Sequence, residues 1–226
     1  MPAPPEAIVF DAYGTLLDVN AAMERQAGRL GPRWDALSAE WRAKQLEYTW
    51  VRSLTGAAHY ENFWLCTREA LRFVFARHDI ADVALEKALM EAYRTLPAYP
   101  EVPGMLRAIR GKGIAVAILS NGTPGMLADA IEAAGIAPLV DEVLSVESVG
   151  IFKPDPRVYR LATRQFGCSP DRLVFVSGNA WDAQAAHAAG MQVVRVNRAD
   201  APDEYGLAES GVPVLPDLSG LADLLP

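Results

Sequence analysis

Six short apolar runs constrain the fold of this 226-residue chain more than any other feature. The runs are Ala7–Phe10, Ile114–Leu119, Glu142–Ser145, Leu173–Val176, Gln192–Val196 and Val212–Leu215. Most are near-continuous, which is the pattern of strands that a sheet buries on both faces. Helical patterns of crossover length lie between several of them, at 102–110, 125–134, 156–166 and 180–189. The alternation predicts an α/β protein with a Rossmann-like parallel sheet and helices on both faces.

The stretch from 19 to 96 has a different character. It contains four of the five tryptophans, and its apolar residues recur at helical spacing with no strand signal between them. We therefore expect a helical cap at 19–96, inserted into a core formed by 1–18 and 97–226. The return segment L-P-A-Y-P-E-V-P-G is typical of a hinge. A cap inserted there can close over the carboxyl ends of the strands, where open α/β sheets bind ligands.

Composition excludes several classes of partner. The net charge is −7 and no run of Lys or Arg is present, whereas nucleic-acid binding depends largely on neutralising phosphates. No apolar run approaches the length of a membrane span, and the segment M-P-A-P-P-E does not resemble a secretory leader. Cys66 and Cys168 lie far apart and suggest no disulfide framework. We expect a cytoplasmic protein with a small-molecule substrate and neither nucleic-acid nor membrane partners.

Polar side chains stand where the predicted strands end. Asp11 follows the first run, Ser120 and Asn121 end the second, and Ser177 follows L-V-F-V. The segment G-I-F-K-P-D-P places Lys153 in a loop after another strand. Because the carboxyl ends of parallel strands meet at one edge of a sheet, these groups are predicted to form one site.

Four motifs in this order carry a family resemblance: D-A-Y-G-T-L, L-S-N-G, K-P-D and S-G-N-A-W-D. They resemble the motifs of the haloacid dehalogenase superfamily, and specifically its 2-haloacid dehalogenase branch. The likeness covers essentially the whole chain, including W-R-A-K-Q-L-E-Y-T-W at 41–50. It implies hydrolysis of (S)-2-haloalkanoic acids to (R)-2-hydroxy acids, with no cofactor or metal, by a homodimer.

Tyr13 separates this branch from its phosphatase relatives. Their first motif reads D-x-D, and further acids in the fourth motif hold Mg²⁺, an ion that prefers carboxylate ligands. Here Tyr13 replaces the second acid, and Gly178 and Asn179 leave Asp182 as the acid of the fourth motif. A halide leaves as a stable anion, so no acid is needed to protonate it. Gly178 also replaces a serine that is common in the branch.

The resemblance implies a role for each remaining motif residue. Asp11 is the expected nucleophile, forming an aspartyl ester, and Lys153 is expected to keep it ionised. Thr15 and Ser177 are expected to orient the same carboxylate, and Asp182 with Asn179 to position or activate water. Ser120 is expected to bind the substrate carboxylate. The expected halide-binding residues are Arg42, Asn121 and Trp181. The residues expected to shape the site and its apolar pocket are Tyr13, Leu46, Phe63, Tyr159 and Trp181.

Two other functions remain open at this stage. One is a Mg²⁺-dependent small-molecule phosphatase of the same superfamily, and the other is a catalytically silent binding protein on this fold. Arg42 could equally lie on a solvated helix face, and Leu46 and Phe63 could simply be packing residues. The three histidines lie near none of the motifs, so a Ser-His-Asp triad has no support.

Overall fold

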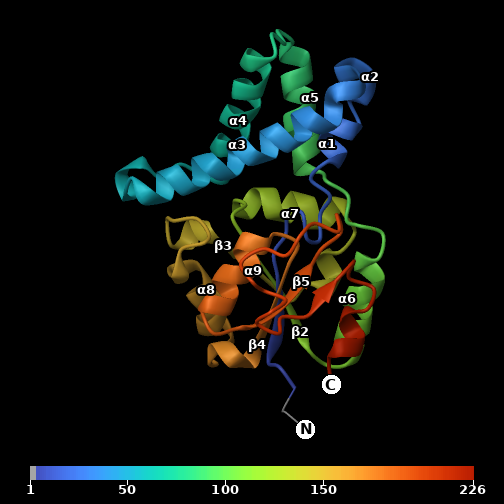
Figure 1. Cartoon of the computed structure of the whole chain (residues 1–226), viewed down its shortest axis with the longest axis vertical. Coiled ribbons are helices and arrows are strands. Elements are labelled where there is room, and N and C mark those ends of the chain that lie inside the picture. The colour runs from blue at the N-terminus through green and yellow to red at the C-terminus, as the bar shows by residue number, and fades with distance from the viewer. Residues whose placement is uncertain (1–3) are drawn as a thin grey trace.

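A computed structural model describes residues 4–226. The predicted core begins at residue 1, so its first three residues lie outside the described part. Its centre is a six-stranded parallel sheet with the order β3-β2-β1-β4-β5-β6 (Figure 1). The strands are β1 (Ala7–Phe10), β2 (Ala115–Ser120), β3 (Glu142–Ser145), β4 (Leu173–Ser177), β5 (Gln192–Val196) and β6 (Val214–Leu215). The predicted parallel α/β sheet is confirmed, with the first strand in the middle.

Burial follows position in the sheet. Every residue of β1 is fully buried, because β2 and β4 flank it and helices cover both faces. β3 is only partly buried, and β6 contains two residues rather than the four expected. Both lie at the edges of the sheet, where one neighbour is missing and burial on both faces is not reached.

The core helices have the expected positions. They are α6 (Val102–Gly111), α7 (Pro124–Ala133), α8 (Pro156–Phe166) and α9 (Ala180–Ala188). Asp155 caps α8 by accepting a hydrogen bond from the Arg157 backbone N–H, and Thr123 caps α7 in the same way through Met126. Figure 1 shows α6 on one side of the sheet and α8 and α9 on the other. This arrangement follows from right-handed crossovers on either side of the central strand.

Helices account for the regular structure between β1 and α6. They are α1 (Ala21–Glu24), α2 (Ala27–Leu30), α3 (Trp34–Leu54), α4 (Phe63–Arg77) and α5 (Val83–Arg94). The long α3 packs against α4, where Trp41 Nε1 donates a hydrogen bond to the Thr67 carbonyl. Figure 1 shows these helices together above the carboxyl ends of the strands. Within residues 4–226, no helix is both long and apolar enough to cross a membrane.

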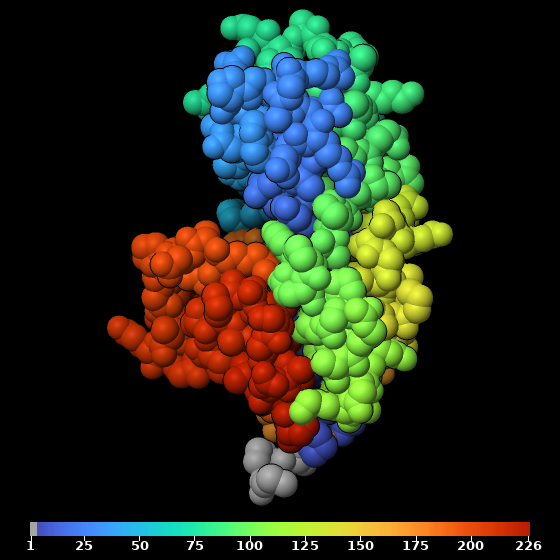
Figure 2. Space-filling model, turned by 90° about the vertical axis from the view of Figure 1, so that its right-hand side faces the viewer, coloured from blue at the N-terminus to red at the C-terminus, as the bar shows by residue number. Residues whose placement is uncertain are grey.

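Two linkers join these helices to the rest of the protein, the outgoing linker at 11–20 and the return linker at 95–101, and they pair with each other. The Asp18 N–H donates to the Pro97 carbonyl at 2.9 Å, and the Tyr99 N–H donates to the Leu16 carbonyl at 3.0 Å. Leu17 and Ala98 form an antiparallel bridge between these bonds. In Figure 2 the light-green return linker lies beside the orange-red carboxyl-terminal part of the chain.

Candidate active site

Asp11 directly follows β1. The carboxyl ends of β1, β2 and β4 and the loop that contains Lys153 meet around it. Its Oδ2 accepts hydrogen bonds from Thr15 Oγ1 at 3.0 Å and from Asn179 Nδ2 at 2.7 Å. Its Oδ1 accepts one from Lys153 Nζ at 3.1 Å. Asp11 is only 5% exposed. The carboxylate is therefore oriented by three donors from three different segments.

Lys153 bridges Asp11 to a second buried carboxylate. Its Nζ lies 2.7 Å from Asp182 Oδ2, and Tyr159 donates its hydroxyl to Asp182 Oδ1 at 2.6 Å. Burial works against the charged form of Lys153, but Asp11 and Asp182 more than offset it and raise the pKa of this ammonium. Lys153 therefore stays protonated between the two acids.

Asp182 is fully buried and sits in the first turn of α9. Burial raises the pKa of Asp182 to about 6, and the Asp11 charge adds to the increase, while Lys153 and the Tyr159 hydroxyl act in the opposite direction. Burial and the adjacent Asp182 also raise the pKa of Tyr159 well above its usual value. Tyr159 is thus a neutral donor, and Asp182 changes charge in mildly acidic solution.

Ser177 corrects one expectation. Its hydroxyl lies 3.4 Å from Asp182 Oδ2 and accepts a hydrogen bond from the Asn179 N–H at 3.0 Å. It was expected to orient Asp11, and this was wrong. The chain turns into α9 directly after β4, which brings Asp182 over Ser177, while Thr15 and Asn179 occupy Asp11 Oδ2.

Two glycines let the loop after β1 and the loop after β4 touch. Gly14 has a φ of +85°, and a Cβ at Gly178 would lie 2.2 Å from the Gly14 carbonyl oxygen. The Gly178 N–H also donates to Thr15 Oγ1 at 2.7 Å. The serine common at this position would not fit this backbone, so glycine here is a requirement of close packing.

The second motif supports the Lys153 loop. Asn121 Oδ1 accepts a hydrogen bond from the Lys153 backbone N–H at 3.0 Å. Ser120 Oγ accepts one from the Gly122 N–H at 3.1 Å. Both side chains are buried, at 0% and 6% exposure for Ser120 and Asn121. The structure brings both residues to the same strand edge as Asp11, as predicted.

Arg42 on α3 contacts the loop after β1. Its guanidinium donates to the Tyr13 carbonyl at 3.2 Å and to Gln45 Oε1 at 2.6 Å, and buried Leu46 follows Gln45 on the helix. The Tyr93 hydroxyl donates to the same Gln45 oxygen at 3.1 Å. Sequence analysis missed Gln45, although its position three residues after Arg42 places both on one helix face.

Aromatic rings form the wall between the cap helices and the strand ends. The ring of Tyr13 stacks on Tyr93 with centroids 5.4 Å apart and contacts Phe63 at 5.5 Å. Burial raises the pKa of Tyr13 well above its usual value, so it is a neutral wall rather than an acid. Trp181 meets Trp50 edge to face at 5.7 Å. Helical spacing in the sequence marks Tyr93 as an apolar position, but its place beside Tyr13 depends on how α5 packs.

These donors do not fit the Mg²⁺ site of the phosphatase relatives. Asp11 and Asp182 already share the Lys153 ammonium, and Tyr13 replaces the additional acid. Among the described residues, no group of three or more His, Cys, Asp or Glu side chains is arranged to hold a metal ion. Mg²⁺ requires an octahedral set of oxygen ligands, and a fixed ammonium disfavours it here.

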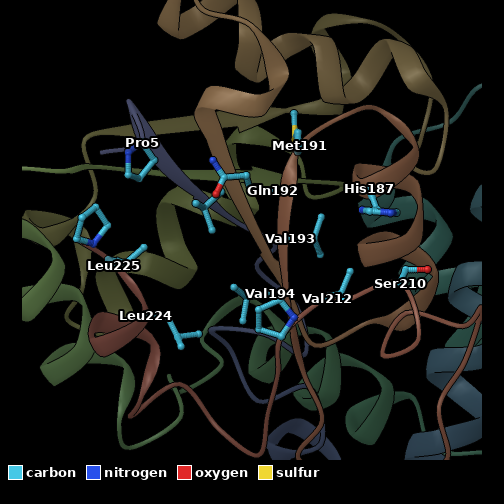
Figure 3. Close-up of a pocket in the computed structure, with 14 residues that line it drawn as sticks. Pro5, His187, Met191, Gln192, Val193, Val194, Ser210, Val212, Leu224 and Leu225 are labelled. Carbon is cyan, nitrogen blue, oxygen red and sulfur yellow. The ribbon is translucent and has the colours of Figure 1, made fainter. Parts of the chain in front are cut away.

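A prominent hollow lies at the opposite end of the sheet. It has a volume of about 390 Å³ and is lined by residues that include Pro5, His187, Gln192 and Leu225 (Figure 3). Pro5 precedes β1 and Gln192 begins β5, so the hollow is at the amino ends of the strands. The described residues that line it include no Asp, Glu, Lys or Arg. A search for the site by surface shape alone would therefore point to this hollow, which lacks the charged groups found around Asp11.

Comparisons with known proteins support the family resemblance of the four motifs. The family of haloacid dehalogenase-like hydrolases matches residues 5–190. The (S)-2-haloacid dehalogenase 1 of Pseudomonas sp. (strain CBS-3) is 43% identical over 222 residues, covering 98% of this chain and 95% of the relative. A crystal structure of a dehalogenase is 41% identical with a TM-score of 0.94, covering 100% of this chain and 99% of that one.

A third similarity concerns a covalent complex. The L-2-haloacid dehalogenase from Xanthobacter autotrophicus with chloropropionic acid covalently bound is 32% identical, with a TM-score of 0.85. The match covers 97% of this chain and 98% of that chain. This protein belongs to the haloacid dehalogenase-like hydrolase family, and the predicted family membership is confirmed.

Proposed function

We propose that this protein is an (S)-2-haloacid dehalogenase, which hydrolyses short (S)-2-haloalkanoic acids to (R)-2-hydroxyalkanoic acids and halide. The surroundings of Asp11 carry the proposal. Three donors hold its carboxylate, and the neighbouring Tyr13 is a packed aromatic ring where phosphatase relatives have an acid. A site of this kind suits a leaving group that needs no proton. The similar dehalogenases support the same reaction.

The first step is attack by Asp11 Oδ1 on C2 of the substrate. Oδ2 already accepts two hydrogen bonds, whereas Oδ1 accepts one, from Lys153, and keeps a lone pair free. The new carbon–oxygen bond forms opposite the halogen, which leaves with the bonding electrons as halide. The configuration at C2 is inverted, and an aspartyl ester remains on Asp11.

The second step is hydrolysis of that ester at the Asp11 carbonyl carbon. Water supplies the oxygen that returns to Asp11, and the 2-hydroxy acid leaves with its new configuration unchanged. One proton from water goes to a base and another to the departing alkoxide, so the overall products are hydroxy acid, halide and a proton. Asp182, with Asn179, is our candidate for positioning or activating this water. Asp182 also sets the position of Lys153.

Cap and core each contribute to substrate binding in this proposal. Ser120, with nearby backbone N–H groups, binds the substrate carboxylate. Arg42, Asn121 and Trp181 receive the departing halide, where a fixed cation is most effective once water is excluded. Leu46 and Phe63 form the apolar side of the pocket. The half-buried Arg42 is anchored by Gln45 and Tyr13 and thus presents its charge at a defined place.

The decisive experiment measures halide release from each enantiomer of 2-chloropropionate, with a chelator present. Release from the (S) form alone, giving (R)-lactate, is the expected result. Asp11→Asn should lower the rate by at least about 10⁴-fold, since the nucleophile is lost. Asp171→Asn is the matched control, because Asp171 is exposed and lies before β4, at the far end of the sheet.

Two outcomes would favour the alternatives. Activity on phosphate esters that requires Mg²⁺ would support the phosphatase. Silence in both assays, with a folded protein, would support the binding protein. The paired ammonium between Asp11 and Asp182 speaks against the first, and the complete set of Asp11 contacts speaks against the second.

The proposal extends to organisation and location. We place the functional boundary of the cap at 19–96 and the catalytic core at 1–18 and 97–226. We also propose a cytoplasmic homodimer formed through the aromatic-rich cap. Val51 and Leu54 on α3 support this interface, because these apolar residues are 51% and 87% exposed. Sedimentation of the full chain, compared with a Leu54→Asp variant, tests the dimer.

A further inference from the structure

Arg198, in the loop after β5, contacts both linkers that join the cap to the core. Its Nη2 donates a hydrogen bond to the Thr15 carbonyl at 3.0 Å. Its Nη1 pairs with Glu101 at 2.5 Å, and its guanidinium carbon lies 3.8 Å from the centre of the Tyr99 ring. The side chains of Arg198 and Glu101 are 20% and 19% exposed, so this pair is largely shielded from solvent.

The contact at Thr15 leads directly to the nucleophile. The Thr15 hydroxyl donates a hydrogen bond to Asp11 Oδ2, and its oxygen, Oγ1, accepts a hydrogen bond from the Gly178 N–H. Its backbone carbonyl accepts the bond from Arg198. A shift of the Thr15 backbone would therefore change the orientation of the Asp11 carboxylate. It would also change the contact between the loop after β1 and the loop after β4.

The contacts at Tyr99 and Glu101 lead to the cap. Tyr99 belongs to the return linker, which pairs with Leu16 and Asp18 of the outgoing linker. Glu101 directly precedes α6 and also accepts the Leu218 N–H at 3.4 Å. A planar guanidinium suits this place, because it can bind two acceptors in its plane while stacking on a ring.

We propose that Arg198 is a positioning residue that holds the Thr15 carbonyl in register with the paired linkers and thereby aims Asp11 at the substrate. This inference rests on the proposed dehalogenase function. Arg198 does not touch substrate in this scheme. It acts through Thr15, and its loss misplaces the nucleophile without removing any reacting group.

The test measures single-turnover halide release and KM for Arg198→Met, which keeps an apolar side chain for the Tyr99 ring. We expect ester formation to slow by about 10- to 100-fold, the range that misplacement by around 1 Å causes, with KM nearly unchanged. Arg198→Ala should recover part of its rate in millimolar guanidinium. Arg172→Met is the matched control, because Arg172 pairs with Glu6 at the far end of the sheet.

The results separate this proposal from a purely structural role. If Arg198 only stabilises the fold, the variants will melt at lower temperature but keep the wild-type rate per folded molecule, and guanidinium will not help. Arg198→Lys serves if the Met variant fails to fold, and its rate should be intermediate because an ammonium lacks the planar fork. A wild-type protein that releases no halide would refute the dehalogenase function itself.

Discussion

The two sides of the candidate site differ in how they are built. On the core side, Lys153 Nζ lies 3.1 Å from Asp11 and 2.7 Å from Asp182, and all three residues are at most 5% exposed. On the cap side, Arg42 donates a hydrogen bond to the Tyr13 carbonyl, and the rings of Phe63 and Tyr93 pack against the Tyr13 ring. Charge is thus concentrated on the strand ends, and shape is supplied by the helices above them.

We expect this difference to give substitutions on the two sides different effects. Buried charges are strongly coupled, so a change to one core residue alters the protonation and geometry of the others. The cap residues nearest Tyr13 make their contacts through the rings of Phe63 and Tyr93 and through the amide of Gln45. Changes in the core should therefore affect rate and pH dependence, and changes in the cap should affect leaving-group and substrate binding.

Among the substitutions that test this difference between core and cap, Lys153→Met should have the largest effect on stability and on rate. Removing the ammonium leaves Asp11 and Asp182 buried without a counter-charge, which we expect to cost about 3–5 kcal/mol of unfolding free energy. Halide release should fall by more than about 10³-fold, since the nucleophile loses its cation. Chemical denaturation and the halide assay measure both effects. Lys112→Met is the control, and a stable, active Lys153→Met would contradict the assignment.

Arg42→Met should have the next largest effect. We expect kcat to fall by about 10²–10³-fold, because a fixed cation no longer meets the departing halide. Stability should change little, since Arg42 is half-buried and pairs with neutral groups. Lys44→Met is a matched control on the same helix, where Lys44 pairs with Glu47. An equal loss of kcat in the two variants would show that the position of Arg42 is not special and that any positive charge on the cap has the same effect.

The smallest expected effect is the fall in the rate of halide release on the acidic limb of the pH profile, where Asp182 becomes protonated. Asp182 has a pKa of about 6, so below that pH the rate should fall roughly tenfold per unit. Stability should move in the opposite direction. A raised pKa in the folded state means that folded protein binds a proton more readily than unfolded chain, so this group adds stability as pH falls from about 6 toward its ordinary value. Asp155→Asn should leave the limb unchanged, and a flat rate from pH 7 to 5 would falsify the Asp182 assignment.

Much of the site was predictable because it is local to strand ends. Asp11, Ser120 and Ser177 stand where apolar runs stop, and the parallel sheet brings them together. The partner of Ser177 was not predictable, since it depends on where the first turn of α9 places Asp182. Gln45 had a local signal in its spacing from Arg42, whereas the pattern around Tyr93 indicated an apolar helix position and not its partner Tyr13.

The sequence by itself determined the parallel sheet, the inserted helices and the edge at which the charged groups meet. Those features depend on short-range patterns, because strand burial and chain alternation are written in consecutive residues. Tertiary structure alone decided that a Cβ at Gly178 would clash with Gly14, that Tyr93 stacks on Tyr13, and that Arg198 joins Thr15 to Glu101. Each of these contacts joins residues more than 75 positions apart. Their geometry exists only after packing brings separate elements together.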